Sequence, residues 1–392
     1  MSLSGVFYLG VRYLARNRAK TLLMVFAFTL VWSLPSAIGL LVSQAEIQLR
    51  ARAETTPLLL GHAGSALELT FNGLYFTKPD ITTLPLSEYR AATESGLVQA
   101  IPLYARFSAG GYPIVATTID YLRFRGLHIS EGRSLLRLGE CVVGSKVAQE
   151  TGVTPGDSLI SSPETLFDLA GVYPLKMSVC GVLSPTGTAD DEAVFVDLKT
   201  AWIIEGLGHG HVEASAASQD EKLDGNGDEI RLNASVVEYN EITPENVDSF
   251  HFHGSMEDHP ITAVILVPRD AKSQALVKGR YAPRDEVQLI SPSEEMIELF
   301  ETVFSVQRLV VALLAGTGVA TLLIGVLVFL LSYRLRKSEF FHLKRLGASV
   351  GSVRTLVMFE GGFVVATSLF LSLVLLFLLG ISAPGLIRWI LT

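Results

Sequence analysis

The chain has 392 residues, a formal net charge of −8 and a mean hydropathy of +0.40. Only 18% of its residues are charged, against roughly 25% in ordinary soluble domains, and 49% are apolar. This composition excludes an intrinsically disordered chain and a small disulfide scaffold, and it argues against a purely soluble enzyme.

The charges are sorted along the chain. Residues 1–44 contain four basic residues and no acidic one, whereas residues 306–392 contain eight basic and two acidic residues. The middle, residues 45–305, keeps 19 basic and 37 acidic residues and therefore a charge of −18. The sequence thus predicts three parts, an acidic middle between two basic ends.

Three apolar segments are predicted to cross a membrane as helices, at residues 21–44, 305–332 and 355–380. Each is long enough for a helix through about 30 Å of hydrocarbon. The first apolar run exceeds the roughly 7–15 residues of a signal-peptide core, so we interpret it as an uncleaved anchor. Pro384 and Gly385 are predicted to end the third helix, which leaves residues 381–392 as an interfacial tail.

The basic flanks predict the orientation of these helices. Residues 1–20, read as an amphipathic helix, and residues 333–354, which we name the basic loop, hold most of the basic residues of the two ends. Short segments rich in Lys and Arg stay on the cytoplasmic side. Both segments are therefore predicted to be cytoplasmic, and residues 45–304 extracytoplasmic.

Residues 45–304 are predicted to form a large α+β domain, because short β-rich runs alternate with helical pieces. The stretch of about 207–260 is acidic, polar and poor in aliphatic residues, and it is interpreted as a long insertion. The strand-like runs are residues 140–144, 176–183, 192–197 and 261–267, and the helical pieces are Ser145–Thr151 and Leu198–Ile204.

The two cysteines, Cys141 and Cys180, both lie in strand-like runs. An oxidising compartment would allow a disulfide between them, whereas two separately buried thiols fit the sequence equally well. The sequence contains no Cys-x-x-Cys motif, which argues against a redox enzyme.

A continuous helix is predicted from Pro292 through the second span to about Lys337, so that a stalk precedes the span. The basic loop follows, and its amphipathic helix is predicted to end at Gly347. The loop begins with a basic stretch, Arg334, Arg336 and Lys337, which is followed by the acid Glu339. A hydrophobic patch of Phe340, Phe341 and Leu343 comes next, and a Lys-Arg-Leu-Gly-Ala-Ser sequence occupies residues 344–349.

This arrangement resembles the MacB/FtsX/LolC-type permeases of ABC transporters, and the resemblance spans most of residues 5–380. Glu360, at the start of the third span, also matches the family, as do residues 124–127, 139–144 and 179–183 in the predicted outer domain. The resemblance implies an α-helical transmembrane region with a MacB-like periplasmic domain. The family usually has four spans, whereas three are predicted here, so a partner helix would take the fourth place.

The resemblance further implies a permease subunit in the bacterial cytoplasmic (inner) membrane. Its partners would be a cytoplasmic ATPase, a second permease subunit forming a homodimer or heterodimer, and a periplasmic binding or adaptor protein. The chain has no Gly-x-x-x-x-Gly-Lys-Ser/Thr motif, so ATP would be hydrolysed by another subunit and the chain is not predicted to be an enzyme. Nothing in the sequence indicates a nucleic-acid partner.

The basic loop would couple the permease to the ATPase. Its apolar side chains would fill a groove on the ATPase, its basic side chains would meet acids around that groove, and the glycine would turn the chain. An ordinary juxtamembrane helix held by anionic lipids is the alternative. The candidate coupling residues are Glu339, Phe340, Phe341, Leu343, Lys344, Arg345 and Gly347.

Five of the eight histidines fall between residues 209 and 259, in the predicted insertion. Two His-x-His pairs in extended chain would each place both imidazoles on one face, which suits a metal such as zinc. A solvated polar loop is the alternative interpretation, and no His-Glu-x-x-His motif of a metallopeptidase is present. The candidate metal ligands are His209, His211, His251, His253 and His259.

Two functional hypotheses remain from the sequence. The first is an ABC permease subunit that moves or extracts a substrate, which the sequence does not identify and which could be related to zinc. The second is a membrane-anchored sensor or scaffold that binds a ligand or a metal without any ATPase. No nucleophile or acid–base constellation supports an extracytoplasmic enzyme.

Overall fold

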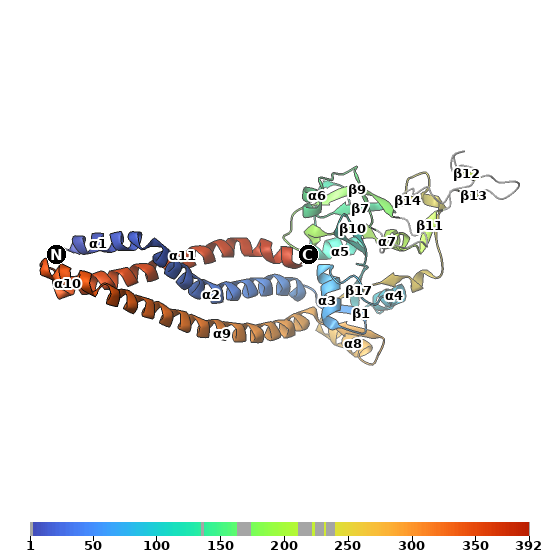
Figure 1. The fold of residues 1–392 in the computed structure, drawn as a ribbon. Helices are drawn as coiled ribbons and strands as arrows, with labels where there is room; N and C mark the ends of the chain where they lie inside the picture. The colour runs from blue at the N-terminus through green and yellow to red at the C-terminus, as the bar shows by residue number, and fades with distance from the viewer. Residues whose placement is uncertain are drawn as a thin grey trace. The chain divides into compact units, whose positions relative to one another are not determined.

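The computed structural model describes residues 3–134, 137–162, 174–210, 222–223, 231–232 and 240–391. The chain divides into two compact units. The helical unit comprises residues 1–50 and 297–392, and the α+β unit comprises residues 51–296. We describe each unit by itself (Figure 1).

The helical unit is built from three long helices and two short ones. The short helices are α1 (Leu3–Arg16) and α10 (Lys337–Arg345). The long helices are α2 (Arg18–Glu54), α9 (Pro292–Leu335) and α11 (Val350–Leu391). Within the described ranges, these three are the helices long and apolar enough to cross a membrane, as the sequence predicts.

The ends of the third spanning helix differ from the prediction. The prediction that Pro384 and Gly385 end this helix is wrong, since α11 continues to Leu391. Proline removes one amide donor, but spanning helices tolerate it because other groups can satisfy the freed carbonyl. The same tolerance applies to Pro35, which lies inside α2.

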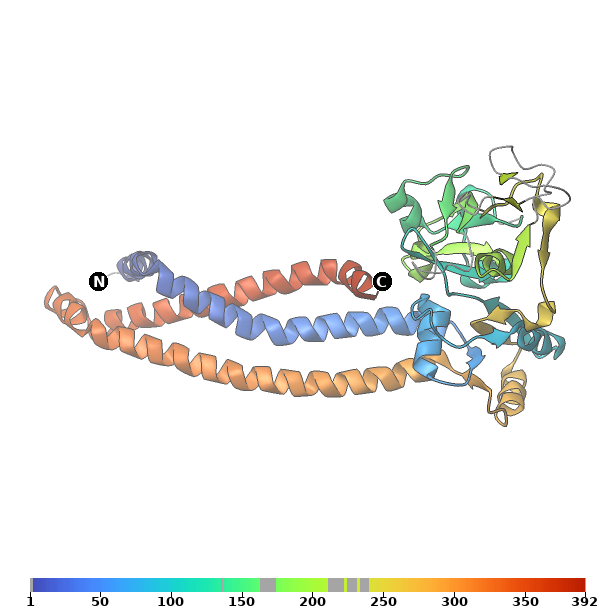
Figure 2. The ribbon, with the colours of Figure 1, turned by 45° about the vertical axis from the view of Figure 1, so that its right-hand side comes forward.

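The long helices pack through small and apolar residues, and α2, α9 and α11 run side by side in both views (Figures 1 and 2). At Gly325 of α9 an added Cβ would lie 2.4 Å from the Phe28 ring of α2, so only glycine admits that ring. Between α2 and α11 the Ser368 hydroxyl donates to the Val25 carbonyl at 3.2 Å. Small residues and hydroxyls of this kind typically join helices in a membrane.

The α+β unit contains two main sheets with short helices around them (Figure 2). The elements that form the first sheet and its helices are β1 (Leu58–His62), α3 (Ala66–Tyr75), α4 (Leu86–Glu94), β3 (Val98–Leu103), β17 (Ala263–Pro268), α8 (Ala271–Tyr281) and β18 (Val287–Ile290). The sheet is antiparallel with the strand order β18-β1-β17-β3.

The second sheet is mixed, with the order β14-β9-β7-β10-β5-β4 in the described part of the chain and with β6 and β8 also paired to β9. Its strands are β4 (Ser108–Ala109), β5 (Tyr112–Thr117), β6 (Ile129–Gly132), β7 (Glu140–Val143), β8 (Ser158–Ile160), β9 (Leu175–Leu183), β10 (Val194–Asp197) and β14 (Asn240–Glu241). Its helices are α5 (Ile119–Arg125), α6 (Ser145–Thr151), the 3-10 helix η1 (Ala189–Glu192) and α7 (Leu198–Ile204).

The predicted strands and helices of this unit are confirmed. The two predicted helices have the bounds of α6 and α7, and the predicted strands correspond to β7, β9, β10 and β17. A bridge between Tyr104 and Ala116 joins the end of β3 to β5, and one continuous apolar core contains residues from both sheets.

Short elements complete the unit between α7 and β17. These are β11 (Gly208–Gly210), β12 (Lys222–Leu223), β13 (Arg231–Leu232), η2 (Val247–Ser249), β15 (Phe250–Phe252), η3 (Met256–Asp258) and β16 (Pro260–Ile261), which pairs with β2 (Leu84–Pro85). The strands β11 and β15 form an antiparallel ribbon.

Candidate functional site

The basic loop folds around the short helix α10. The chain turns after the C-terminal end of α10 at Gly347, whose φ of +93° lies in the left-handed region that favours glycine. The Ala348 amide donates to the Leu343 carbonyl at 3.0 Å, and the Gly347 amide donates to the Lys344 carbonyl at 3.1 Å. These two hydrogen bonds satisfy carbonyls that the helix end would otherwise leave open. The helix α10 thus ends at Arg345, two residues before the predicted end, and Gly347 makes the turn that follows it.

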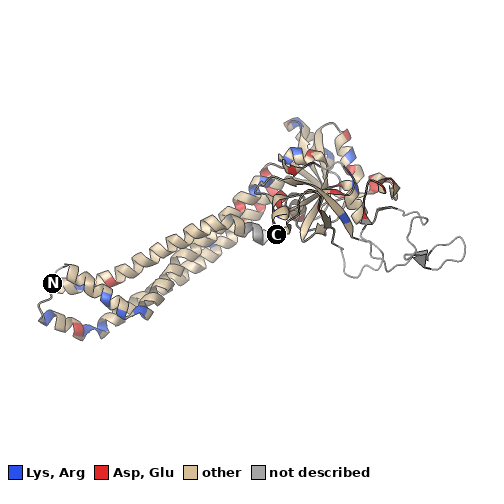
Figure 3. Ribbon diagram, turned by 90° about the horizontal axis from the view of Figure 1, so that it is seen from above, with Lys and Arg blue, Asp and Glu red and all other residues tan. Residues whose placement is uncertain are grey.

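Lys and Arg residues gather at this end of the helical unit, around α1 and α10, while the middle of the long helices is almost free of charge (Figure 3). The guanidinium of Arg336 contacts two acids and an aromatic ring. Its Nη1 donates to both carboxylate oxygens of Glu360 at 2.9 Å, and its Nε donates to Glu339 at 3.1 Å. Its carbon lies 3.5 Å from the centroid of the Tyr13 ring.

This arrangement joins the loop to the two neighbouring helices. Arg336 precedes α10, Glu360 belongs to α11, and Tyr13 belongs to α1. Glu360 is buried, with its side chain 6% exposed, and Arg336 is partly buried, with its side chain 12% exposed. Sequence reasoning treated Arg336 and Glu360 as separate features and missed the pair, although both lie in the motifs that carry the family resemblance.

Phe340, one of the predicted coupling residues, belongs to the interior of the helical unit. Its side chain is 4% exposed and packs with Val6, Val353 and Leu356. The predicted patch of Phe340, Phe341 and Leu343 is therefore divided, because an α-helix points neighbouring residues in different directions.

The other coupling residues leave a mixed apolar and basic surface on α10. Phe341 is 55% exposed, and the Arg345 guanidinium lies 4.9 Å from its ring centroid. Lys344 is exposed, and Leu346, which sequence reasoning did not select, is 84% exposed. We name Phe341, Lys344, Arg345 and Leu346 the α10 face. Leu343 is half-buried, and Glu339 is exposed beside Arg336.

In the α+β unit, the β11–β15 ribbon brings together three of the predicted metal ligands. His209 of β11 lies directly opposite His251 of β15. The His253 amide donates to the Leu207 carbonyl at 3.1 Å, which extends the ladder by one residue pair. A ligand atom from each of His209, His251 and His253 lies within 4.8 Å of the others.

Of the two remaining candidate ligands, only His259 is among the described residues, and it does not belong to this cluster. His211 lies outside the described residues. His259 is 4% exposed, with its ring centroid 4.8 Å from that of Trp202. The Nδ1 atom of His259 lies 2.9 Å from the Ser255 carbonyl oxygen. Because a carbonyl oxygen can only accept a hydrogen bond, this Nδ1 carries the proton and donates. His259 is held by the interior of the unit and is not placed with the other histidines.

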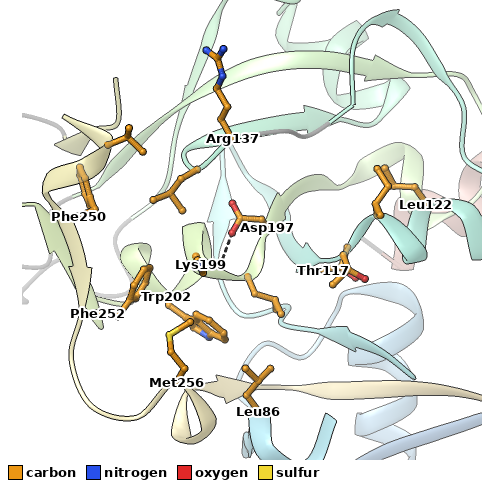
Figure 4. Close-up of a pocket in the computed structure, with 15 residues that line it drawn as sticks. Leu86, Thr117, Leu122, Arg137, Asp197, Lys199, Trp202, Phe250, Phe252 and Met256 are labelled. Carbon is orange, nitrogen blue, oxygen red and sulfur yellow. Dashed lines mark hydrogen bonds between the residues drawn. The ribbon is translucent and has the colours of Figure 1, made fainter. Parts of the chain in front are cut away.

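A pocket of about 690 Å³ lies on the other side of the ribbon (Figure 4). Phe250 and Phe252 of β15, Trp202 of α7 and Met256 line one part of it, and Arg137 points away from these four side chains. The Asp197 carboxylate also lines it but is already used, because it accepts from the amides of Lys199 and Thr200 at the start of α7. The pocket wall is thus mainly aromatic and apolar, as binding sites for apolar groups usually are. Its other lining residues are Leu86, Thr117, Thr118, Ile119, Leu122, Leu138, Leu198, Lys199 and Val247.

The two cysteines are free and buried, on the neighbouring strands β7 and β9. This agrees with the alternative of separately buried thiols. Burial raises the pKa of Cys180 to about 11 and also raises the pKa of Cys141.

We expect both thiols to react very slowly with an alkylating reagent in the folded protein at pH 8. Only the thiolate reacts, and a pKa of about 11 leaves on the order of one thiol in a thousand ionised at that pH. Mass spectrometry after treatment with iodoacetamide measures this, with unfolded protein in urea as the fully reactive control. Rapid alkylation of Cys180 in the folded chain would contradict the burial.

Comparison with known proteins places the chain among transporters. Residues 24–234 match the family model of the MacB-like periplasmic core domain. No curated protein matches the chain significantly. Two solved structures align with 10% identity each, the periplasmic region of MacB from Actinobacillus actinomycetemcomitans (TM-score 0.36, 63% of this chain and 92% of that chain) and the extracellular domain of the noncanonic ABC-type transporter YknZ from Gram-positive bacteria (TM-score 0.33, 59% and 98%). A permease domain from Porphyromonas gingivalis aligns with 11% identity (TM-score 0.26, 60% and 86%).

The family match covers more than half of the chain and includes most of the first spanning helix and most of the α+β unit. Three apolar helices combined with a periplasmic α+β domain define a membrane protein of the transporter class. The chain belongs to the MacB/FtsX-type permeases of ABC transporters. Members of this family are transporter permeases that work in a membrane with an ATPase, and they are generally not enzymes themselves.

Proposed function

We propose that the chain is the transmembrane subunit through which a separate cytoplasmic ATPase drives movement of the α+β unit. The movement would export, extract or transport a substrate on the outer side of the bacterial inner membrane. In this proposal residues 1–20 and the basic loop are cytoplasmic, residues 45–304 are periplasmic, and two permease subunits pair around the ATPase.

The α10 face is the single observation that carries the proposal. Phe341 and Leu346 are large apolar side chains left exposed beside two cations at a membrane-proximal helix end. Exposed aromatic residues that accompany basic ones are typical of the centres of protein interfaces. Anionic lipid headgroups are the competing partner for this surface, and ATPase binding by the variants below distinguishes the two.

The surroundings of Arg336 support a lever function for α10. An ion pair with Glu360 of α11 and a contact with the Tyr13 ring of α1 hold the start of the helix on these two neighbours. A force applied to the α10 face would therefore move several helices together. The helix α9 is uninterrupted over 44 residues, about 66 Å of helix. It begins at Pro292, in the chain of the α+β unit, and ends at Leu335, just before α10.

Co-purification with the ATPase tests the proposal. We expect the Phe341→Ala/Leu346→Ala variant to lose most of its ATPase binding, because removal of two central apolar anchors typically costs an interface at least tenfold in affinity. The matched control is Phe370→Ala, since Phe370 is 64% exposed on the spanning part of α11. Membrane insertion and the midpoint of thermal unfolding should be unchanged in both variants.

Phe340→Ala separates binding from folding. Because Phe340 is buried in the helical unit, this variant should lower the stability of the unit, by about 3–5 kcal/mol for a full phenylalanine cavity. Its ATPase binding should recover at low temperature, where the fold is intact. Undiminished binding by Phe341→Ala/Leu346→Ala would remove the α10 face from the mechanism.

The alternative function is a membrane-anchored sensor or scaffold without an ATPase, and the pocket beside the aromatic wall is the observation that favours it. The same co-purification distinguishes the two functions. A sensor would bind no ATPase in its wild-type form, whereas a permease would bind one through its basic end. In either case the mainly apolar wall leads us to propose a substrate or ligand with an apolar part.

A further inference from the structure

The ribbon of β11 and β15 has two chemically different faces. Side chains alternate between the faces of a strand, so Phe250 and Phe252 project to one side of β15 and His251 to the other. Residues Gly208 and Gly210 lie opposite the two phenylalanines. A Cβ at Gly208 would lie 2.7 Å from the Phe252 ring, and a Cβ at Gly210 would lie 2.8 Å from the Phe250 ring. Because Gly208 and Gly210 have no side chains, both rings can lie against this face of β11.

The other face of the ribbon carries only imidazoles from these positions. His209 and His251 are cross-strand partners, and His253 follows His251 by two residues. Their ring centroids are separated by 4.8 to 5.0 Å. His253 is exposed and His209 is half-buried, so an ion from solvent can reach the group.

We propose that His209, His251 and His253 bind a transition-metal ion of the zinc type, and that the bound ion stiffens the aromatic wall of the pocket. Three imidazoles and one open position filled by water are an established ligand set for Zn²⁺. Tetrahedral coordination at about 2.0 Å places the nitrogen atoms about 3.3 Å apart. The ligand atoms already lie within 4.8 Å of one another, so side-chain rotation completes the site without moving the strands.

The ion would act on the pocket through β15. His251 lies between Phe250 and Phe252, which line the pocket, and His253 directly follows Phe252. The Phe252 ring lies 6.3 Å from the Trp202 ring, edge to face. An ion that joins β11 to β15 fixes the backbone that carries these rings. The site is independent of the ATPase contacts proposed above, because all its residues belong to the α+β unit.

The first experiment measures binding by the full-length chain in detergent. Metal-free protein is titrated with Zn²⁺ in competition with a chromogenic chelator, and Co²⁺ serves as a spectroscopic probe of tetrahedral coordination. We expect one ion per chain. His251→Ala and His253→Ala should each weaken binding by more than the about 10- to 100-fold that loss of an outer-shell partner costs.

Matched variants separate a ligand from a structural residue. His128→Ala is the control, because His128 is exposed in another part of the same unit. His253→Cys should retain metal binding, since a thiolate is a zinc ligand, whereas His253→Gln should lose it. Binding that is absent in the wild type, or equal in His251→Ala and in His128→Ala, would overturn the site.

The second experiment follows the pocket wall. In a Trp32→Phe/Trp389→Phe background, Trp202 is the remaining tryptophan of the three in the chain. We expect Zn²⁺ to change its fluorescence in proportion to site occupancy, and we expect no change in the added presence of His251→Ala. If zinc binds stoichiometrically while Trp202 emission stays constant, the ion does not act on the wall.

Discussion

Replacing Asp190 by Asn should lower the free energy of unfolding of the α+β unit by about 3–5 kcal/mol, because it leaves a buried guanidinium without a counter-charge. The side chains of Arg52 and Asp190 are 6% and 2% exposed. Two hydrogen bonds of 2.6 and 2.9 Å join them. The Tyr121 hydroxyl donates to the same carboxylate at 2.7 Å, and Arg52 Nε donates to the Leu74 carbonyl.

Thermal unfolding of the full-length chain measures this effect, followed by the fluorescence of buried Trp202 in the Trp32→Phe/Trp389→Phe background. A loss of this size corresponds to a decrease in Tm on the order of 10 °C for a unit of this length. Asp120→Asn is the matched control, since Asp120 pairs with Arg123 at 3.5 Å with side chains 41% and 75% exposed. Exposed pairs contribute little that can be measured. Equal Tm values for the two variants would contradict the importance of the buried pair.

The same pair predicts how stability depends on pH. Burial by itself would raise the pKa of Asp190, but the Arg52 guanidinium and the hydrogen bonds from Arg52 and Tyr121 hold that pKa below its usual value of 3.8. A carboxyl group with a lowered pKa in the folded state stabilises the fold above the unfolded-state pKa. This contribution should be complete above about pH 4 and should be lost as the pH falls further. In Asp190→Asn the corresponding part of the acid-dependent decrease should be absent.

Replacing Arg336 by Gln should destabilise the helical unit by a similar amount, about 3–5 kcal/mol, because Glu360 would keep a buried charge without a partner. Its side chain is only 6% exposed. We expect Arg336→Lys to recover the stability only in part, because an ammonium group cannot contact Glu360 and Glu339 through separate nitrogens or stack its plane on Tyr13. Thermal unfolding in detergent micelles measures both effects.

A double variant makes this second prediction specific. Arg336→Gln/Glu360→Gln removes both charges and should be more stable than Arg336→Gln alone, since no unpaired charge remains. Glu339→Gln is the control for loss of an exposed partner of Arg336, as Glu339 is 63% exposed. A double variant less stable than either single variant would show that the ion pair does not account for the stability.

Much of the architecture follows from local properties of the sequence. Three apolar runs, each long enough as a helix to cross the bilayer, predict the three spanning helices. Such segments must be helical because hydrocarbon contains no water that could satisfy an open backbone. In the α+β unit, short β-rich runs predict β7, β9, β10 and β17, and the helices Ser145–Thr151 and Leu198–Ile204 have the predicted bounds. The basic loop motif also indicates the family. The match of residues 24–234 to the family model confirms that membership.

The candidate sites were less predictable because they depend on which side chains meet. Phe340 and Phe341 are adjacent in sequence, yet one is buried against α1 and α11 and the other is exposed. The buried pair of Arg52 and Asp190 joins residues 138 positions apart. His259 was grouped with the other histidines by proximity in sequence, but packing against Trp202 keeps it apart from them.

The sequence by itself determined the segregation of charge, the spanning helices and the class of protein, because hydropathy, charge and turn residues act over short distances along the chain. Only the tertiary structure decided which of the described histidines lie together. It pairs His209 with His251 across the ribbon and seats Phe250 and Phe252 over glycines on the opposite face. The register of β11 against β15 sets that arrangement. Register depends on contacts between segments some forty residues apart, and no local pattern in either segment specifies those contacts.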